Sequence, residues 1–164
     1  MSACFFCTVQ KNKDQIIWEN SLLFAIYDIN PVSPGHTLVI PKRHVSSLVE
    51  LSEKEWINYK LAIQEVTAIN EKTNFKDIYN KLVNSNISKE SVWFCRRALD
   101  NPKINNRPDA YNFGINEGKE AGRTIDHFHW HIIPRFKNDV IDPIGGVRNI
   151  IPGMGNYRIL RNLK

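Results

Sequence analysis

The stretch His127-Phe128-His129-Trp130-His131 (HFHWH) decides the architecture of this chain. Because successive side chains of a strand point to opposite faces, it predicts a strand over residues 127–133 with all three histidines on one face. The apolar residues between them share the other face, which we expect to pack into a core. One segment therefore holds a structural element and a group of reactive side chains.

The residues alone leave two interpretations of this histidine face. A metal site is the first, but the Cα atoms of His127 and His131 would lie about 13 Å apart in a strand. Metal–nitrogen bonds are about 2 Å long, so one ion can bind two neighbouring histidines but hardly all three. Acid–base catalysis by imidazole is the second interpretation.

The rest of the chain predicts an α+β fold, in which an antiparallel β-sheet packs with one long helix and smaller helices. Ser52 and Glu55 form a capping box that opens the long helix. Its apolar face holds Trp56, Tyr59, Ile63, Val66 and Ile69. Further strands are expected at residues 16–19, 22–27, 36–41 and 111–116. A Pro-rich loop covers 28–35, and the Gly- and Pro-rich tail from Asn138 should be mostly loop.

The positive charge of the chain is concentrated in one segment. Residues 72–107 hold eight basic and three acidic residues, which accounts for the whole net charge of +5. General binding of nucleic acid is therefore a poor inference from the charge. We interpret residues 1–164 as a single domain with a basic insertion at about 76–107, because this segment is too short for a core of its own.

Composition limits the class of protein further. Of 164 residues, 42% are hydrophobic and 24% are charged, which are globular values. No apolar run approaches the ~20 residues of a membrane helix, and the first residues lack a signal-peptide pattern. With only three cysteines, two of them close together, these features favour a reducing, cytoplasmic setting without membrane partners.

The histidine segment, together with residues 28–41 (DINPVSPGHTLVIP) and 112–122 (NFGINEGKEAG), resembles the histidine triad (HIT) family of nucleotide hydrolases and transferases. The likeness is greatest to the bacterial branch described as diadenosine tetraphosphate hydrolase-like, through residues 131–135 (HIIPR) and 142–148 (DPIGGVR). The resemblance covers most of the chain outside the basic segment.

This resemblance implies that His129 attacks the α-phosphorus of a nucleotide and forms a nucleotidyl-histidine intermediate. It also implies that His131 and His36 bind or polarise phosphate and leaving-group oxygens. The implied nucleotide-binding residues are Asp28, Ile29, Asn116, Gly122, Arg123 and Thr124. Where the family usually has Gln, this chain has Arg123 followed by Thr124. Arg123 can donate to phosphate or point to solvent, which leaves the substrate open.

The motif Cys4-Phe5-Phe6-Cys7 is ambiguous by itself among zinc, redox chemistry and chance. HIT proteins with this motif resemble the galactose-1-phosphate uridylyltransferases, whose structural zinc is completed by two histidines. That likeness implies zinc on Cys4, Cys7, His44 and His127, a closed tetrahedral set. The ion would tie the N-terminus to the sheet and affect stability more than substrate affinity. The rival interpretation is a frayed N-terminus without metal. No organic cofactor is expected.

The leading hypothesis is a hydrolase of nucleotide phosphoanhydrides or phosphoramidates, with substrates of the dinucleoside polyphosphate type. Two alternatives are a nucleotidyltransferase using phosphate or a sugar phosphate as acceptor, and a non-catalytic nucleotide-binding protein. The resemblance also implies a homodimer. Because Trp93, Phe94 and Leu99 need burial, we expect the insertion to be partly helical. The insertion would place Arg96 or Arg97 near the distal phosphates, unless it is only a solvated surface segment without a role at the site.

Overall fold

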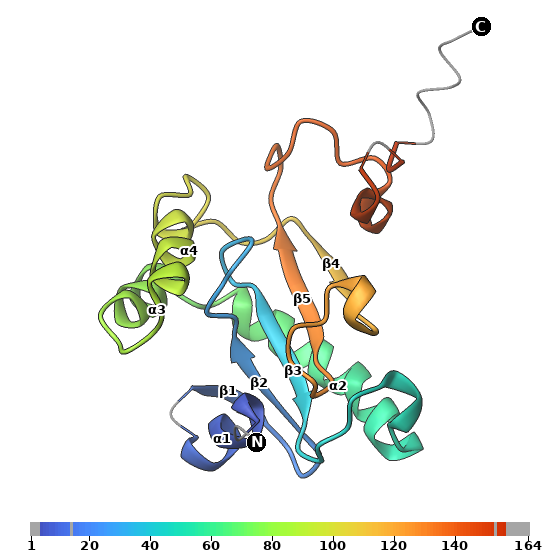
Figure 1. Ribbon diagram of the computed structural model, residues 1–164. Coiled ribbons are helices and arrows are strands. Elements are labelled where there is room, and N and C mark those ends of the chain that lie inside the picture. The colour runs from blue at the N-terminus through green and yellow to red at the C-terminus, as the bar shows by residue number, and fades with distance from the viewer. Residues whose placement is uncertain (1–3, 14, 153, 157–164) are drawn as a thin grey trace, which may run out of the picture.

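A five-stranded antiparallel sheet forms the centre of the protein in the computed structural model, which describes residues 4–13, 15–152 and 154–156 (Figure 1). The order of the strands is β1-β2-β3-β5-β4. Their bounds are β1 Ile16–Glu19, β2 Leu23–Tyr27, β3 Thr37–Pro41, β4 Ala110–Gly114 and β5 Trp130–Arg135. The predicted α+β fold is confirmed, and the histidine segment lies beside β3 in the sheet.

The start of the histidine strand differs from the prediction of residue 127, because β5 begins only at Trp130. Extending the register that pairs Val39 with Trp130 would place Pro41 opposite Phe128. Proline has no N–H to donate, so the ladder cannot continue there. The N–H of Phe128 instead donates to the carbonyl of Val45 at 2.6 Å.

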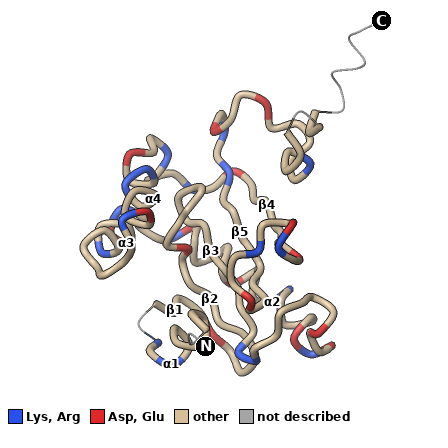
Figure 2. The backbone as a smooth tube through the Cα atoms, viewed as in Figure 1, with Lys and Arg blue, Asp and Glu red and all other residues tan. Residues whose placement is uncertain are grey.

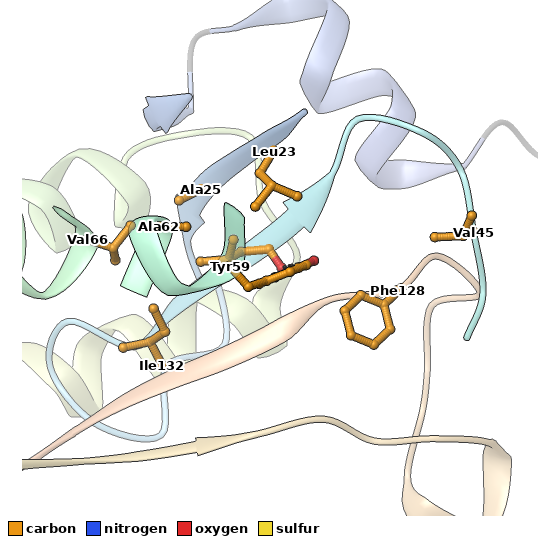
Figure 3. Close-up of a cluster of buried hydrophobic side chains, with 9 residues drawn as sticks. Leu23, Ala25, Val45, Tyr59, Ala62, Val66, Phe128 and Ile132 are labelled. Carbon is orange, nitrogen blue, oxygen red and sulfur yellow. Dashed lines mark hydrogen bonds between the residues drawn. The ribbon is translucent and has the colours of Figure 1, made fainter. Parts of the chain in front are cut away.

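The predicted alternation of side chains holds beyond the strand itself. Phe128 and Ile132 belong to the buried cluster on the α2 side of the sheet (Figure 3), and Trp130 packs against this cluster. The rings of His127 and His129 contact Phe6, which lies on the other face. The imidazoles therefore share the face opposite the long helix.

The long helix α2 (Glu53–Asn70) begins at the predicted capping box. The hydroxyl of Ser52 accepts from the N–H of Glu55, and the carboxylate of Glu55 accepts from the N–H of Ser52. The face of α2 that is buried against the sheet includes fewer of the predicted apolar residues than expected. Its buried hydrophobic residues are Tyr59, Ala62 and Val66, whereas Trp56 is half exposed.

The N-terminal residues form a helix that the sequence did not predict, α1 (Phe5–Asn12). Phe6 and Val9 of α1 pack on side chains of β2 and β3. Because α1 and α2 cover opposite faces of the sheet, all of β2 is buried. Short 3₁₀ helices occur at η1 (Leu48–Glu50), η2 (Lys119–Ala121) and η3 (Gly146–Ile150), the last in an otherwise irregular tail.

The basic segment contains two helices, α3 (Phe75–Val83) and α4 (Lys89–Leu99), so its predicted partial helicity is confirmed. They pack on each other and on Tyr27 of the sheet. Buried members of this cluster include Phe75, Tyr79 and Cys95. Lys and Arg positions occur along both helices, with fewer Asp and Glu positions among them (Figure 2). None of the helices within the described residues has both the length and the hydropathy of a membrane span.

Candidate active site

A pocket of about 330 Å³ brings together side chains that are far apart in the sequence. Of the residues singled out in the sequence, Asp28, Ile29, Thr124, His129 and His131 line it. The other lining residues are Phe5, Phe6, Ile26, Asn30, Leu38 and Ile125. Apolar walls with a few imidazole and carboxylate groups are typical of small-molecule sites.

His129 is held in one orientation at the wall of this pocket. Its Nδ1 lies 2.8 Å from the carbonyl oxygen of His127. A carbonyl can only accept, so Nδ1 carries the hydrogen and donates it. In the neutral imidazole, Nε2 then holds the lone pair. The ring also packs against Phe6 and His131, with centroid distances of 5.1 and 5.0 Å. This arrangement presents an oriented nitrogen nucleophile.

His36 and His131 form a hydrogen-bonded pair beside His129. The Nε2 of His36 lies 3.0 Å from Nδ1 of His131, and the Nδ1 of His36 lies 3.3 Å from a carboxylate oxygen of Asp28. The N–H of Val32 is farther from that Nδ1, at 3.5 Å, so we assign the Nδ1 hydrogen to the contact with Asp28. His131 then donates from Nδ1, and its buried Nε2, which has no partner among the described residues, holds a lone pair.

Burial keeps both of these histidines neutral. Burial, together with a smaller contribution from the nearby imidazoles, lowers the pKa of His36 to about 3 and that of His131 to about 4. The same environment raises the pKa of Asp28 above its ordinary value, because desolvation disfavours the carboxylate. A neutral imidazole can accept a proton at neutral pH, whereas a cationic imidazole cannot.

The low pKa values predict that acid destabilises the fold. The unfolded chain binds a proton at His36 and His131 below about pH 6.5, while the folded chain does not until about pH 4. The free energy of unfolding should therefore fall by about 2 kcal/mol between pH 6 and pH 5 from these two groups. In His36→Asn the fall should be smaller by about 1 kcal/mol, as measured by urea unfolding at each pH. Equal slopes in the two proteins would contradict the prediction.

A second cluster contains the four predicted metal ligands. The Sγ of Cys4 lies 3.4 Å from Nδ1 of His127, and the Sγ of Cys7 lies 3.3 Å from Nδ1 of His44 and 3.7 Å from Nδ1 of His127. All four ligand atoms lie within 4.8 Å of one another. A tetrahedral zinc with bonds of about 2.3 Å to sulfur and 2.05 Å to nitrogen separates these atoms by about 3.6 Å. The cluster therefore fits one metal ion.

Neighbouring groups orient the histidines of this cluster. The Nε2 of His127 lies 2.9 Å from the carbonyl of Pro41, so Nε2 carries the hydrogen and Nδ1 is free to coordinate. Arg43, adjacent to His44, donates to both carboxylate oxygens of Glu55, at 2.8 and 3.2 Å. Glu55, which belongs to the capping box of α2, thus also anchors Arg43, the residue next to the metal ligand His44.

The sequence interpretation missed Phe5 and Phe6 as pocket residues. The sequence does contain a signal for these two residues, because both phenylalanines lie between Cys4 and Cys7. When Cys4 and Cys7 face one ion, the first turn of α1 is fixed, and the two rings are fixed with it. The metal cluster and the pocket consequently share one short helix.

Other predicted nucleotide-binding residues lie outside the pocket lining. Asn116 and Gly122 are neighbours in the loop before β5, where Gly122 has a φ of +91°. Arg123 donates to the carbonyl of Ser46, at a short distance, and lies near the carboxylates of Glu117 and Asp126. It is thus neither at the pocket nor free in solvent, and it braces its own loop.

The arginines of α4 do not line the pocket either. Arg97 stacks over the ring of Trp93 at 4.9 Å, and both line a separate hollow with residues 31–34. In Figure 1, α3 and α4 lie at the left of the view, and η2, the orange turn beside β4, lies at the right. The structure therefore does not support the expectation that Arg96 or Arg97 faces the distal phosphates.

The fold and the row of imidazoles define an α+β protein of the histidine triad class. The chain belongs to the HIT family, whose HIT domain matches residues 9–138. It is 29% identical over 139 residues to a bis(5'-adenosyl)-triphosphatase of Dictyostelium discoideum, covering 85% of this chain and 72% of that protein. It is 28% identical to an AP-4-A phosphorylase of Mycobacterium tuberculosis, covering 84% of this chain and 55% of that protein.

A solved structure with a similar fold is a zinc-bound histidine triad family protein from Mycobacterium smegmatis. The TM-score is 0.60 with 24% sequence identity, over 85% of this chain and 80% of that one.

Proposed function

We propose that this protein hydrolyses phosphoanhydride or phosphoramidate bonds of nucleotides, with dinucleoside polyphosphates as the substrate type. The reaction would pass through a nucleotidyl-histidine on His129. One observation carries the proposal: the Nδ1–H of His129 is held by a carbonyl, which leaves the Nε2 lone pair at the wall of a pocket. The match to the HIT domain and the resemblance to a bis(5'-adenosyl)-triphosphatase support it.

The chemistry consists of two displacements at one phosphorus. In the first, Nε2 of His129 attacks the α-phosphorus, an N–P bond forms, and the leaving group departs with the electron pair of its bond to phosphorus; an amine leaving group also takes up a proton from solvent. In the second, water attacks the same phosphorus, and the N–P bond breaks. We assign the proton of this water to the Nε2 of His131, which is held through His36 by Asp28.

Nucleotide binding would use the polar and apolar parts of the same pocket. Asp28 is the residue we assign to the ribose hydroxyls and Ile29 the residue we assign to the base. The loop with Asn116, Gly122 and Thr124 would face the phosphates, for which backbone N–H groups at glycine are suited. Arg123 would act by holding this loop in place.

The second candidate function is nucleotidyl transfer, in which phosphate replaces water as the acceptor. The resemblance to an AP-4-A phosphorylase favours it. The third candidate, a non-catalytic nucleotide-binding protein, does not require the oriented lone pair of His129. The three candidates differ in their products, so one experiment separates them.

The experiment incubates the protein with diadenosine triphosphate, diadenosine tetraphosphate or adenosine phosphoramidate, with and without inorganic phosphate, in ¹⁸O-labelled water. Hydrolysis predicts AMP with one ¹⁸O atom whether or not phosphate is present. Transfer predicts ADP without the label from the attacked half, no labelled AMP, and turnover only when phosphate is added. Binding without any product from all three substrates would overturn both enzymatic proposals.

We also propose that the metal of the second cluster is zinc. The donor set of two thiolates and two imidazoles, and their spacing, support this identity. Zinc would fix the start of α1 and the backbone of His127. A homodimer and a cytoplasmic location remain further parts of the proposal.

A further inference from the structure

Helix α4 contacts the loop after β2 at two consecutive residues. The hydroxyl of Ser91 donates to Oδ1 of Asn30 at 2.8 Å, and the thiol of Cys95 donates to the carbonyl of Ile29 at 3.4 Å. Both α4 side chains are buried. Since Ile29 and Asn30 line the pocket that contains His129, the insertion reaches the site through this loop.

Helix α3 holds the other end of the same loop. The hydroxyl of Tyr79 accepts from the N–H of Gly35 at 2.8 Å, and the ring of Phe75 packs on Gly35. A Cβ at residue 35 would lie 2.5 Å from that ring, and the φ of +83° also favours glycine. The loop between Asp28 and His36 is therefore fixed at both ends by the inserted helices.

The direction of the hydrogen bonds at Asn30 follows from the cap of α4. The Oγ of Ser88 accepts from the N–H of Ser91, and the hydroxyl of Ser88 donates to Oγ of Ser91. The hydrogen of Ser91 is then free to go to Asn30. Because Oδ1 of Asn30 accepts from Ser91, the amide presents its oxygen to α4 and its NH₂ group away from it.

We propose that Asn30 determines nucleobase specificity and that Ser91 is the positioning residue that fixes its amide. The proposal rests on the proposed function, because it concerns the nucleotide of that site. Within the described chain, the NH₂ group of Asn30 has no hydrogen-bond partner. The same pocket lining includes Ile29 and Phe5, which suit the flat apolar face of a base. The NH₂ group of Asn30 selects a base that has a hydrogen-bond acceptor within its reach. This acceptor is a ring nitrogen or a carbonyl oxygen.

The test is calorimetric titration with AMP, GMP, CMP and UMP, which contain no phosphoanhydride bond. We expect the parent protein to prefer one base. Asn30→Ala should weaken binding of the preferred nucleotide by about 3- to 10-fold, which is the worth of one hydrogen bond. Ser91→Ala frees the amide to rotate, so the preference between bases should shrink by a similar factor.

The double variant and a control separate positioning from general stabilisation. If Ser91 acts through Asn30, the double variant should bind each nucleotide as Asn30→Ala does, whereas independent effects would add. Ser91→Thr, which keeps the hydroxyl, should restore the preference. Ser85→Ala is the matched control, because among the described residues its hydroxyl donates to the carbonyl of Leu82 at the end of α3. It should bind as the parent does.

Three results would overturn the inference. They are a parent without base preference, a Ser91→Ala variant that keeps the parent's preference, and additive losses in the double variant. Each would leave the proposed function standing, provided that the parent binds nucleotides. A parent that binds none of the four and cleaves no substrate would overturn the proposed function itself.

Discussion

Replacing His129 with asparagine is expected to lower kcat by about 10⁴-fold or more while the protein stays folded. The amide of asparagine can donate to the carbonyl of His127 as Nδ1 does, so the local hydrogen bond has a substitute. It offers no lone pair comparable to that of Nε2, and loss of a covalent nucleophile costs several orders of magnitude. Steady-state hydrolysis of a dinucleoside polyphosphate measures the effect, and circular dichroism reports on the fold.

His131→Asn is the matched comparison, because it also removes one imidazole from the same face but leaves the nucleophile. Loss of a general base should slow the step with water by about 10²- to 10⁴-fold. The nucleotidylated protein should then accumulate in His131→Asn and be absent in His129→Asn, as mass spectrometry after acid-free quenching would reveal. Activity of His129→Asn within tenfold of the parent would mean that another residue attacks the phosphorus.

The second large effect is expected at the metal cluster. Protein purified without chelator should contain one zinc per chain, and Cys7→Ser should lose most of it, since one of four ligands becomes a poor one. The loss should lower the Tm by about 10 °C or more, which corresponds to a few kcal/mol for a domain of this size. Elemental analysis and calorimetry measure the two quantities.

The structure adds a smaller effect on substrate binding to this prediction. Phe5 and Phe6 line the pocket and are held by the same turn of α1, so nucleotide affinity should also decrease when zinc is lost. Asn12→Ala, at the exposed end of α1, is the control and should keep its zinc. Absence of metal from the fresh parent protein would contradict the zinc assignment.

Much of the fold was predictable because it follows from local chain geometry. The alternation of histidines and apolar residues places Phe128 and Ile132 in the core without knowledge of the partner strand. The capping box of Ser52 and Glu55 likewise involves residues only three apart. The end of pairing near Pro41 was not predictable, because it depends on which strand lies beside the histidine segment.

The sequence by itself determined the α+β class, the common face of the three histidines and the start of the long helix. Only the tertiary structure decided that Arg123 braces its loop and that Ser91 holds Asn30. The physical reason is the range of the interactions. Periodicity and caps depend on neighbours within one turn or a few residues. The partners of Arg123 and Ser91 include residues 77 and 61 positions away, and such contacts exist only once the sheet and helices have packed.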